Sequence, residues 1–101
     1  MRAEYALEKL RLAIEGMAVS PRPLQLRLES AHLTFHPIRE DDFPSDGMKA
    51  IYRDLMDRLT AVKDPSRGYV PATVAQLSDD EAEEIARMIV NLCDALEAHL
   101  S

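Results

Sequence analysis

Residues 78–100 carry the pattern that most limits how this chain can fold. Apolar side chains recur there at steps of three and four, at Ala82, Ile85, Ile89, Leu92 and Leu96. Ser78 and Glu81 stand where a capping box places its serine N-cap and the glutamate three residues later. Acidic residues fill the first turn, where the helix dipole favours them. The pattern predicts an amphipathic helix over residues 79–100, whose apolar stripe is widened by Ala86, Cys93 and Leu100.

Three further segments carry apolar residues at helical spacing. Their patterns predict helices over residues 3–18, 22–36 and 45–63. Ser20 and Pro21 resemble an N-cap serine followed by an N1 proline, and we expect them to begin the second helix. Residues 24–28 also alternate like a strand, but a single strand would have no partner in this chain, which favours the helix.

Two connectors separate these segments. Residues 37–47 are acidic and contain two prolines, and we expect Phe43 to anchor them as an apolar residue. Residues 64–77 are long for a connection, so they should cross the end of the bundle and pack on it. We expect one helical turn after Pro71, over residues 73–77.

These elements predict an all-α fold, an antiparallel bundle of four main helices with one extra short helix in the 64–77 connector. The chain has 101 residues, the usual size of one domain, so we expect a single helical domain over residues 1–101. Tryptophan is absent and aromatic residues make up 5%, so the core must consist mainly of aliphatic side chains, methionine and alanine.

The net charge of −6 excludes some classes of partner. Residues 78–101 hold seven acidic residues and one basic residue, Arg87, and they account for the whole excess. Phosphate backbones repel such a surface, so we expect no direct nucleic-acid binding. No apolar run approaches the length of a membrane span, and the single cysteine, Cys93, allows no intrachain disulfide. We therefore expect a cytoplasmic protein.

Glu29, His32 and His36 form the only local spacing that suits a metal ion. On a helix the two histidines share one face, and two imidazoles one turn apart can bind one transition metal ion. Leu33 excludes the H-E-x-x-H motif of zinc proteases, and a di-iron bundle needs a second Glu-x-x-His pair. The sequence favours two histidines at the edge of an apolar face, with a metal-binding helical-bundle protein or enzyme that uses Glu29, His32 and His36 as the alternative.

No other pattern indicates catalysis or a cofactor. Cys93 lies beside an apolar stripe, which favours a buried structural thiol over a nucleophile paired with His99. The acidic stretches at residues 40–42 and 79–84 lack the alternating ligands of a calcium-binding loop, and we interpret both as solvated faces. We expect no catalytic residue and no cofactor.

The order of three short motifs gives the chain a resemblance. Arg27-Leu28-x-x-Ala31 is followed by Asp42-Phe43-Pro44 and then by an amphipathic helix ending in Leu59-Thr60. Over roughly residues 7–100 the chain resembles small uncharacterised helical proteins found in bacteria. The resemblance implies an all-helical fold and a cytoplasmic bacterial setting, and it brings no assigned activity and no catalytic residue.

The apolar residues outnumber the positions that a four-helix monomer can bury. On ideal helices Leu26 and Leu33 point away from the face of Leu28, and Met88 and Val90 lie outside the stripe of the last helix. Exposed apolar surface of this kind marks interfaces, and a two-fold dimer is the commonest way to bury it. We expect an interaction or adaptor protein that forms a homodimer or binds a protein partner. Any contact through the last helix should be antiparallel or use its C-terminal half, around Val90, Leu96 and Leu100.

Overall fold

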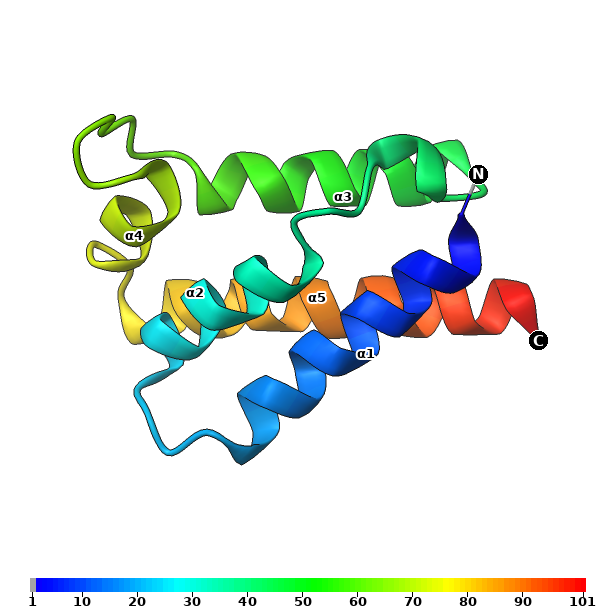
Figure 1. The fold of residues 1–101 in the computed structure, drawn as a ribbon, viewed down its shortest axis with the longest axis horizontal. Coiled ribbons are helices and arrows are strands. Elements are labelled where there is room, and N and C mark those ends of the chain that lie inside the picture. Colours follow the sequence, from blue (N-terminus) through cyan, green and yellow to red (C-terminus); the bar gives the residue numbers. More distant parts are fainter. Residues whose placement is uncertain (1) are drawn as a thin grey trace.

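The computed structural model describes residues 2–101, and every regular element within that range is helical (Figure 1). This confirms the predicted all-α fold with four main helices and one short one. A single 3-10 turn, η1, covers Glu40–Asp42. The five α-helices are α1 (Ala3–Val19), α2 (Leu24–Phe35), α3 (Asp46–Leu59), α4 (Tyr69–Val74) and α5 (Asp79–Leu100).

Helix α5 is the element on which the others pack. Its predicted capping box is present, with Glu81 N–H donating to Ser78 Oγ at 3.1 Å and Ser78 N–H donating to Glu81 Oε1 at 2.9 Å. Helix α3 runs antiparallel to it, and α1 crosses it obliquely on the other side (Figure 1). Helix α2 packs on α1 and α5, and α4 closes the end of the bundle against α2 and α3.

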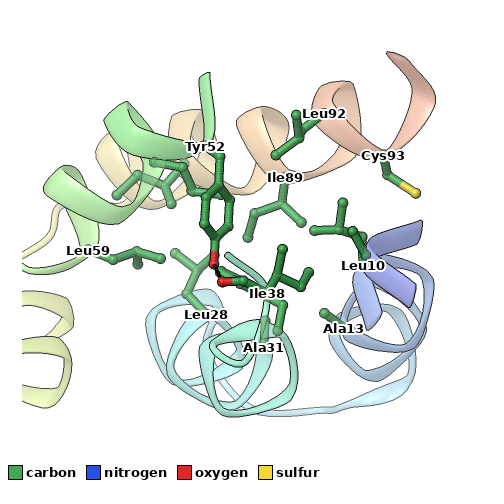
Figure 2. Packing of buried hydrophobic residues seen from close by; sticks show 14 of the residues in the cluster. Leu10, Ala13, Leu28, Ala31, Ile38, Tyr52, Leu59, Ile89, Leu92 and Cys93 are labelled. Atoms are coloured by element: carbon green, nitrogen blue, oxygen red, sulfur yellow. Dashed lines mark hydrogen bonds between the residues drawn. The ribbon is translucent and has the colours of Figure 1, made fainter. Parts of the chain in front are cut away.

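The core is mostly aliphatic, as the composition predicts. Figure 2 shows side chains from α1, α2, α3 and α5 meeting around Ile89 and Leu28. Two phenylalanines, Phe35 and Phe43, are the largest fully buried side chains. Phe43 therefore anchors its connector as expected.

Two helix boundaries differ from the prediction by more than one residue. Helix α2 begins at Leu24 rather than at residue 22, and Ser20 Oγ accepts a hydrogen bond from the Arg22 N–H at 3.3 Å in a turn before the helix. The carbonyl of Pro23 accepts the first helical hydrogen bonds instead, from Leu26 and Arg27. Helix α3 ends at Leu59 rather than at residue 63.

The short helix α4 lies earlier in the connector than the sequence predicts. The helix contains Pro71 rather than following it. The N–H groups of a first helical turn have no hydrogen-bond partner within the helix, so a proline there, which lacks an N–H, costs no helical hydrogen bond. Gly68 precedes the helix with a φ of 99°, a conformation that glycine adopts without strain. Val70 and Val74 are buried, so the connector packs on the bundle as expected.

Asp42, in the acidic stretch at residues 40–42, is not the solvated residue that the sequence suggests. Asp42 is only 4% exposed. Its carboxylate accepts hydrogen bonds from Arg2 Nε at 3.1 Å, from Arg2 Nη2 at 3.0 Å and from the Arg39 N–H at 2.9 Å. Burial alone would raise the pKa of the Asp42 carboxyl, but these hydrogen bonds outweigh it and hold the pKa below its ordinary value.

Tyr52 holds the same connector from the side of α3. Its hydroxyl donates to the carbonyl oxygen of Ile38 at 2.7 Å, inside the core (Figure 2). The Tyr52 ring packs against Phe43, with ring centroids 5.0 Å apart. Burial, and then the negative charge of Asp42, raise the pKa of Tyr52 to about 12. The connector is thus fastened to α1 through Asp42 and to α3 through Tyr52.

We predict that Asp42→Asn destabilises the protein by about 1.5–3 kcal/mol at pH 7, because charged hydrogen bonds are lost in a buried position. The matched control is Asp41→Asn, since Asp41 is exposed. The stabilisation by Asp42 is present above the ordinary pKa of an aspartate and is lost as the pH falls through the lowered folded value. Urea unfolding at several pH values measures both effects. Equal stability of the two variants at pH 7 would contradict the assignment.

We predict that Tyr52 makes the folded state less stable relative to the unfolded state as the pH rises from 10 to 12. The unfolded phenol ionises near its ordinary pKa of 10.0, while the buried one stays neutral up to about 12. The loss reaches about 2–3 kcal/mol over that interval. Urea unfolding should show that Tyr52→Phe removes this part of the pH dependence, whereas the control Tyr69→Phe, at an exposed ring, keeps it.

Candidate functional site

Helix α2 brings together two of the three residues that the sequence offers to a metal. The rings of His32 and His36 stack with centroids 5.7 Å apart and 30° between their planes. Glu29 lies one turn earlier on the same helix. Within residues 2–101, however, no three histidine, cysteine, aspartate or glutamate side chains are close enough to form a ligand group. The structure therefore joins the histidines and leaves Glu29 outside their cluster.

His32 is held by the core beneath it. Its ring meets the buried ring of Phe35 edge-on, with centroids 5.6 Å apart and an interplanar angle of 79°. Burial, and secondly the proximity of His36, lower the pKa of His32 below its ordinary value. His36 ends the helix and is exposed. The pair thus consists of one half-buried imidazole and one open to solvent.

A hollow of about 360 Å³ lies beside His32, between α2 and the start of α4. We call it the α2–α4 groove. The residues that line it are Glu29, His32, Leu33, Thr60, Tyr69, Val70 and Pro71. Apart from the phenol of Tyr69, only Glu29 and His32 among them have titratable side chains. The groove is therefore mainly apolar and carries little charge.

Two large apolar side chains beside this groove are exposed. Leu33 on α2 is 66% exposed and Tyr69 on α4 is 43% exposed. The exposure of Leu33 confirms the sequence prediction. The wall formed by Thr60 and α4 was not predicted, because helical periodicity does not report which distant segment packs beside α2. The signal for it in the sequence is the apolar run Tyr69-Val70-Pro71 within the 64–77 connector.

Other apolar residues that the sequence placed at the surface are covered. Leu26 and Met88 are half-buried, and Met88 packs against the core and accepts a contact from Arg58 Nη1 at 3.3 Å. Leu96 is fully buried, as its place in the apolar stripe of α5 predicts, so it cannot take part in the expected contact through the C-terminal half of that helix. Val90 and Leu100 are exposed as predicted. The exposed apolar residues on the remaining surface include Leu12, Val19 and Ile51.

The acidic first turns of α5 have structural partners. Asp79 Oδ1 accepts from Gln25 Nε2 at 2.9 Å, and Glu84 forms an ion pair with Arg58 at 3.3 Å. Hydrogen bonds within the capping box lower the pKa of Glu81. These carboxylates join α5 to α2 and α3 and remain exposed, as the prediction of a solvated face requires.

Cys93 is a buried thiol, and Figure 2 shows its sulfur beside α1. Burial, and then the negative charge of Asp94, raise the pKa of the thiol above its ordinary value. The other charges that act on it belong to Arg11 and Glu97 rather than to His99. The arrangement favours the thiol form and gives Cys93 no base.

Comparison with protein-family models, with curated proteins and with solved structures finds no match. The resemblance to small bacterial helical proteins therefore stays a prediction. None of the helices in the described residues 2–101 combines the length and the apolar character that a membrane crossing requires.

We predict that Cys93 reacts slowly with iodoacetamide at pH 8 in the folded protein, because the thiol is buried and its pKa is raised. The reaction should become at least about tenfold faster in denaturing urea, where the thiol is accessible. Mass spectrometry of the alkylated chain measures both rates. Equal rates in the two conditions would show that Cys93 is an accessible thiol.

Proposed function

We propose that this chain is a small interaction protein of adaptor type that self-associates through the α2–α4 groove. The observation that carries the proposal is the exposure of Leu33 directly beside an apolar hollow. Exposed apolar surface around a hollow is typical of interaction sites.

A second copy of the chain fits this surface because the surface carries both a protruding side chain and a hollow that can receive one. In a two-fold dimer the same patch faces itself, so a protruding side chain of one protomer can enter the hollow of the other. Leu33 protrudes and the hollow between Glu29 and Tyr69 lies next to it. A dimer through this patch removes two leucines and two tyrosine rings from water.

The charge distribution favours the same surface. Burying an unpaired charge is costly, and the α2–α4 groove contains one carboxylate, Glu29. A second hollow, between α3 and α5, also exposes Ile51 but is bordered by Asp54, Arg58, Glu84 and Arg87. A two-fold contact there would bring several formal charges together and remove water from them. The α2–α4 groove is therefore the better candidate for contact with a second copy.

The proposal includes a cytoplasmic setting without direct nucleic-acid contact. The single cysteine is consistent with a reducing compartment, and the net charge of −6 lacks a compensating basic stripe. Catalysis forms no part of the proposal.

We predict that sedimentation equilibrium at micromolar concentration gives a mass above the 11.4 kDa of one chain. Leu33→Glu should weaken the association at least about tenfold, equivalent to about 1.4 kcal/mol, because it buries a charge at the centre of the contact. Circular dichroism should show unchanged helix content, since Leu33 contributes little to the core.

Leu12→Glu is the matched control, because Leu12 is also exposed but lies on α1, away from the groove. It should leave the association unchanged. A mass of one chain at all concentrations would reject the dimer. A dimer that Leu12→Glu disrupts and Leu33→Glu does not would reject the groove as its interface. Ile89→Asp, in the core, should unfold the chain. Its circular dichroism spectrum is therefore the reference for lost helix content.

A further inference from the structure

His32 is the residue of the α2–α4 groove whose charge changes near neutral pH. It is the one histidine among the residues that line the groove. Its ring is half-buried and rests edge-on against buried Phe35, with centroids 5.6 Å apart. Burial, and secondly the proximity of His36, hold the pKa of His32 below its ordinary value, so the imidazole is neutral at pH 7.5. A neutral imidazole suits an apolar contact, whereas an imidazolium would lose its hydration there.

The groups around His32 do not compensate a positive charge on it. On α2 the His36 ring lies beside it, with centroids 5.7 Å apart. On the opposite wall Lys63 Nζ lies 5.0 Å from the centroid of the Tyr69 ring. Glu29 lines the groove, but its carboxylate is not among the described groups that act on the charge of His32. A proton on His32 therefore adds a positive charge between a second imidazole and the lysine across the groove.

We propose that protonation of His32 separates the dimer, so that the chain self-associates through the α2–α4 groove at neutral pH and dissociates in mildly acidic solution. This inference rests on the proposed self-association, because it concerns the same surface. A second copy that covers the groove removes water from His32. A two-fold contact contains this group twice, so a dimer that forms at low pH must either bury two imidazolium charges or release two protons.

The net charge of the chain acts in the opposite direction. The chain carries −6 at pH 7 with neutral histidines, and its pI is about 4.9. Acidification to pH 5.5 therefore reduces the repulsion between two copies and favours their association. The effect of His32 has the other sign: the separated chains bind more protons than the dimer, so association weakens as the pH falls through the pKa of His32 in the separated chain. A loss of association on acidification is thus a sign of histidine protonation rather than of net charge.

The test is sedimentation equilibrium of the full chain at pH 7.5 and at pH 5.5, at one ionic strength. The dissociation constant of the dimer should be at least about tenfold larger at pH 5.5. Circular dichroism at both pH values checks that the helix content is unchanged. A second measurement follows the imidazole NMR signals of the unaltered chain. The pKa of His32 should be lower in a concentrated, dimeric sample than in a dilute, monomeric one, whereas the pKa of His99 should be the same in both.

His32→Gln carries no charge at either pH, so the ratio of its two dissociation constants should fall below about two. His99→Gln is the matched control, since His99 is exposed on α5 and outside the groove, and it should keep the tenfold ratio. If His32→Gln does not associate, the NMR comparison of the unaltered chain decides. A dimer at pH 7.5 whose dissociation constant does not rise at pH 5.5, or a pKa of His32 that is equal in the two samples, overturns this inference and leaves the dimer in place. The mass of one chain at both pH values instead rejects the self-association itself, and this inference with it.

Discussion

The burial of the Asp42 carboxylate is the constraint on which the arrangement of this bundle depends. A charge without partners would be too costly in that position, and the hydrogen bonds from Arg2 and the Arg39 N–H offset the cost. They also hold the connector between α2 and α3 inside the molecule, so that Ile38 and Phe43 enter the core. Helix α3 packs on α5, α4 and η1, and it meets the α2 side of the bundle through this connector. The connector thus contributes side chains to the core, as the helices do.

Sequence patterns predict the helices of this chain well because the relevant interactions are local. The stripe of α5 and its capping box involve residues at most four positions apart, and both appear as expected. The wrong predictions concern positions whose structure depends on residues that are distant in the sequence. Ser20 and Pro21 have the right chemistry for a cap, yet the chain begins α2 after Pro23. Asp42 looks like a solvated acid until Arg2, forty positions earlier, is placed beside it.

The candidate site likewise has some features that local sequence spacing predicts and others that depend on distant residues. The four-residue spacing of His32 and His36 predicts a pair on one face, and the stacked rings confirm it. The groove next to them is formed by the packing of α4 on α2, which no periodicity reports. Exposure was predicted correctly for Leu33, which lies on the outer face of one helix. It was predicted wrongly for Met88, which is half-buried because it packs against the core and contacts Arg58 of α3.

The separation of α1 and α5 along the sequence has a consequence for how the chain reaches its fold during synthesis. Helix α1 packs on α5, and Arg11 forms an ion pair with Glu97 across 86 positions of sequence. On a ribosome, α1 and α2 are therefore complete long before the surface that covers them exists. They can pair with each other early, but their remaining apolar faces stay open until the last helix emerges. The chain therefore closes its core only after α5 emerges, and this step forms the long-range contacts that fold slowly.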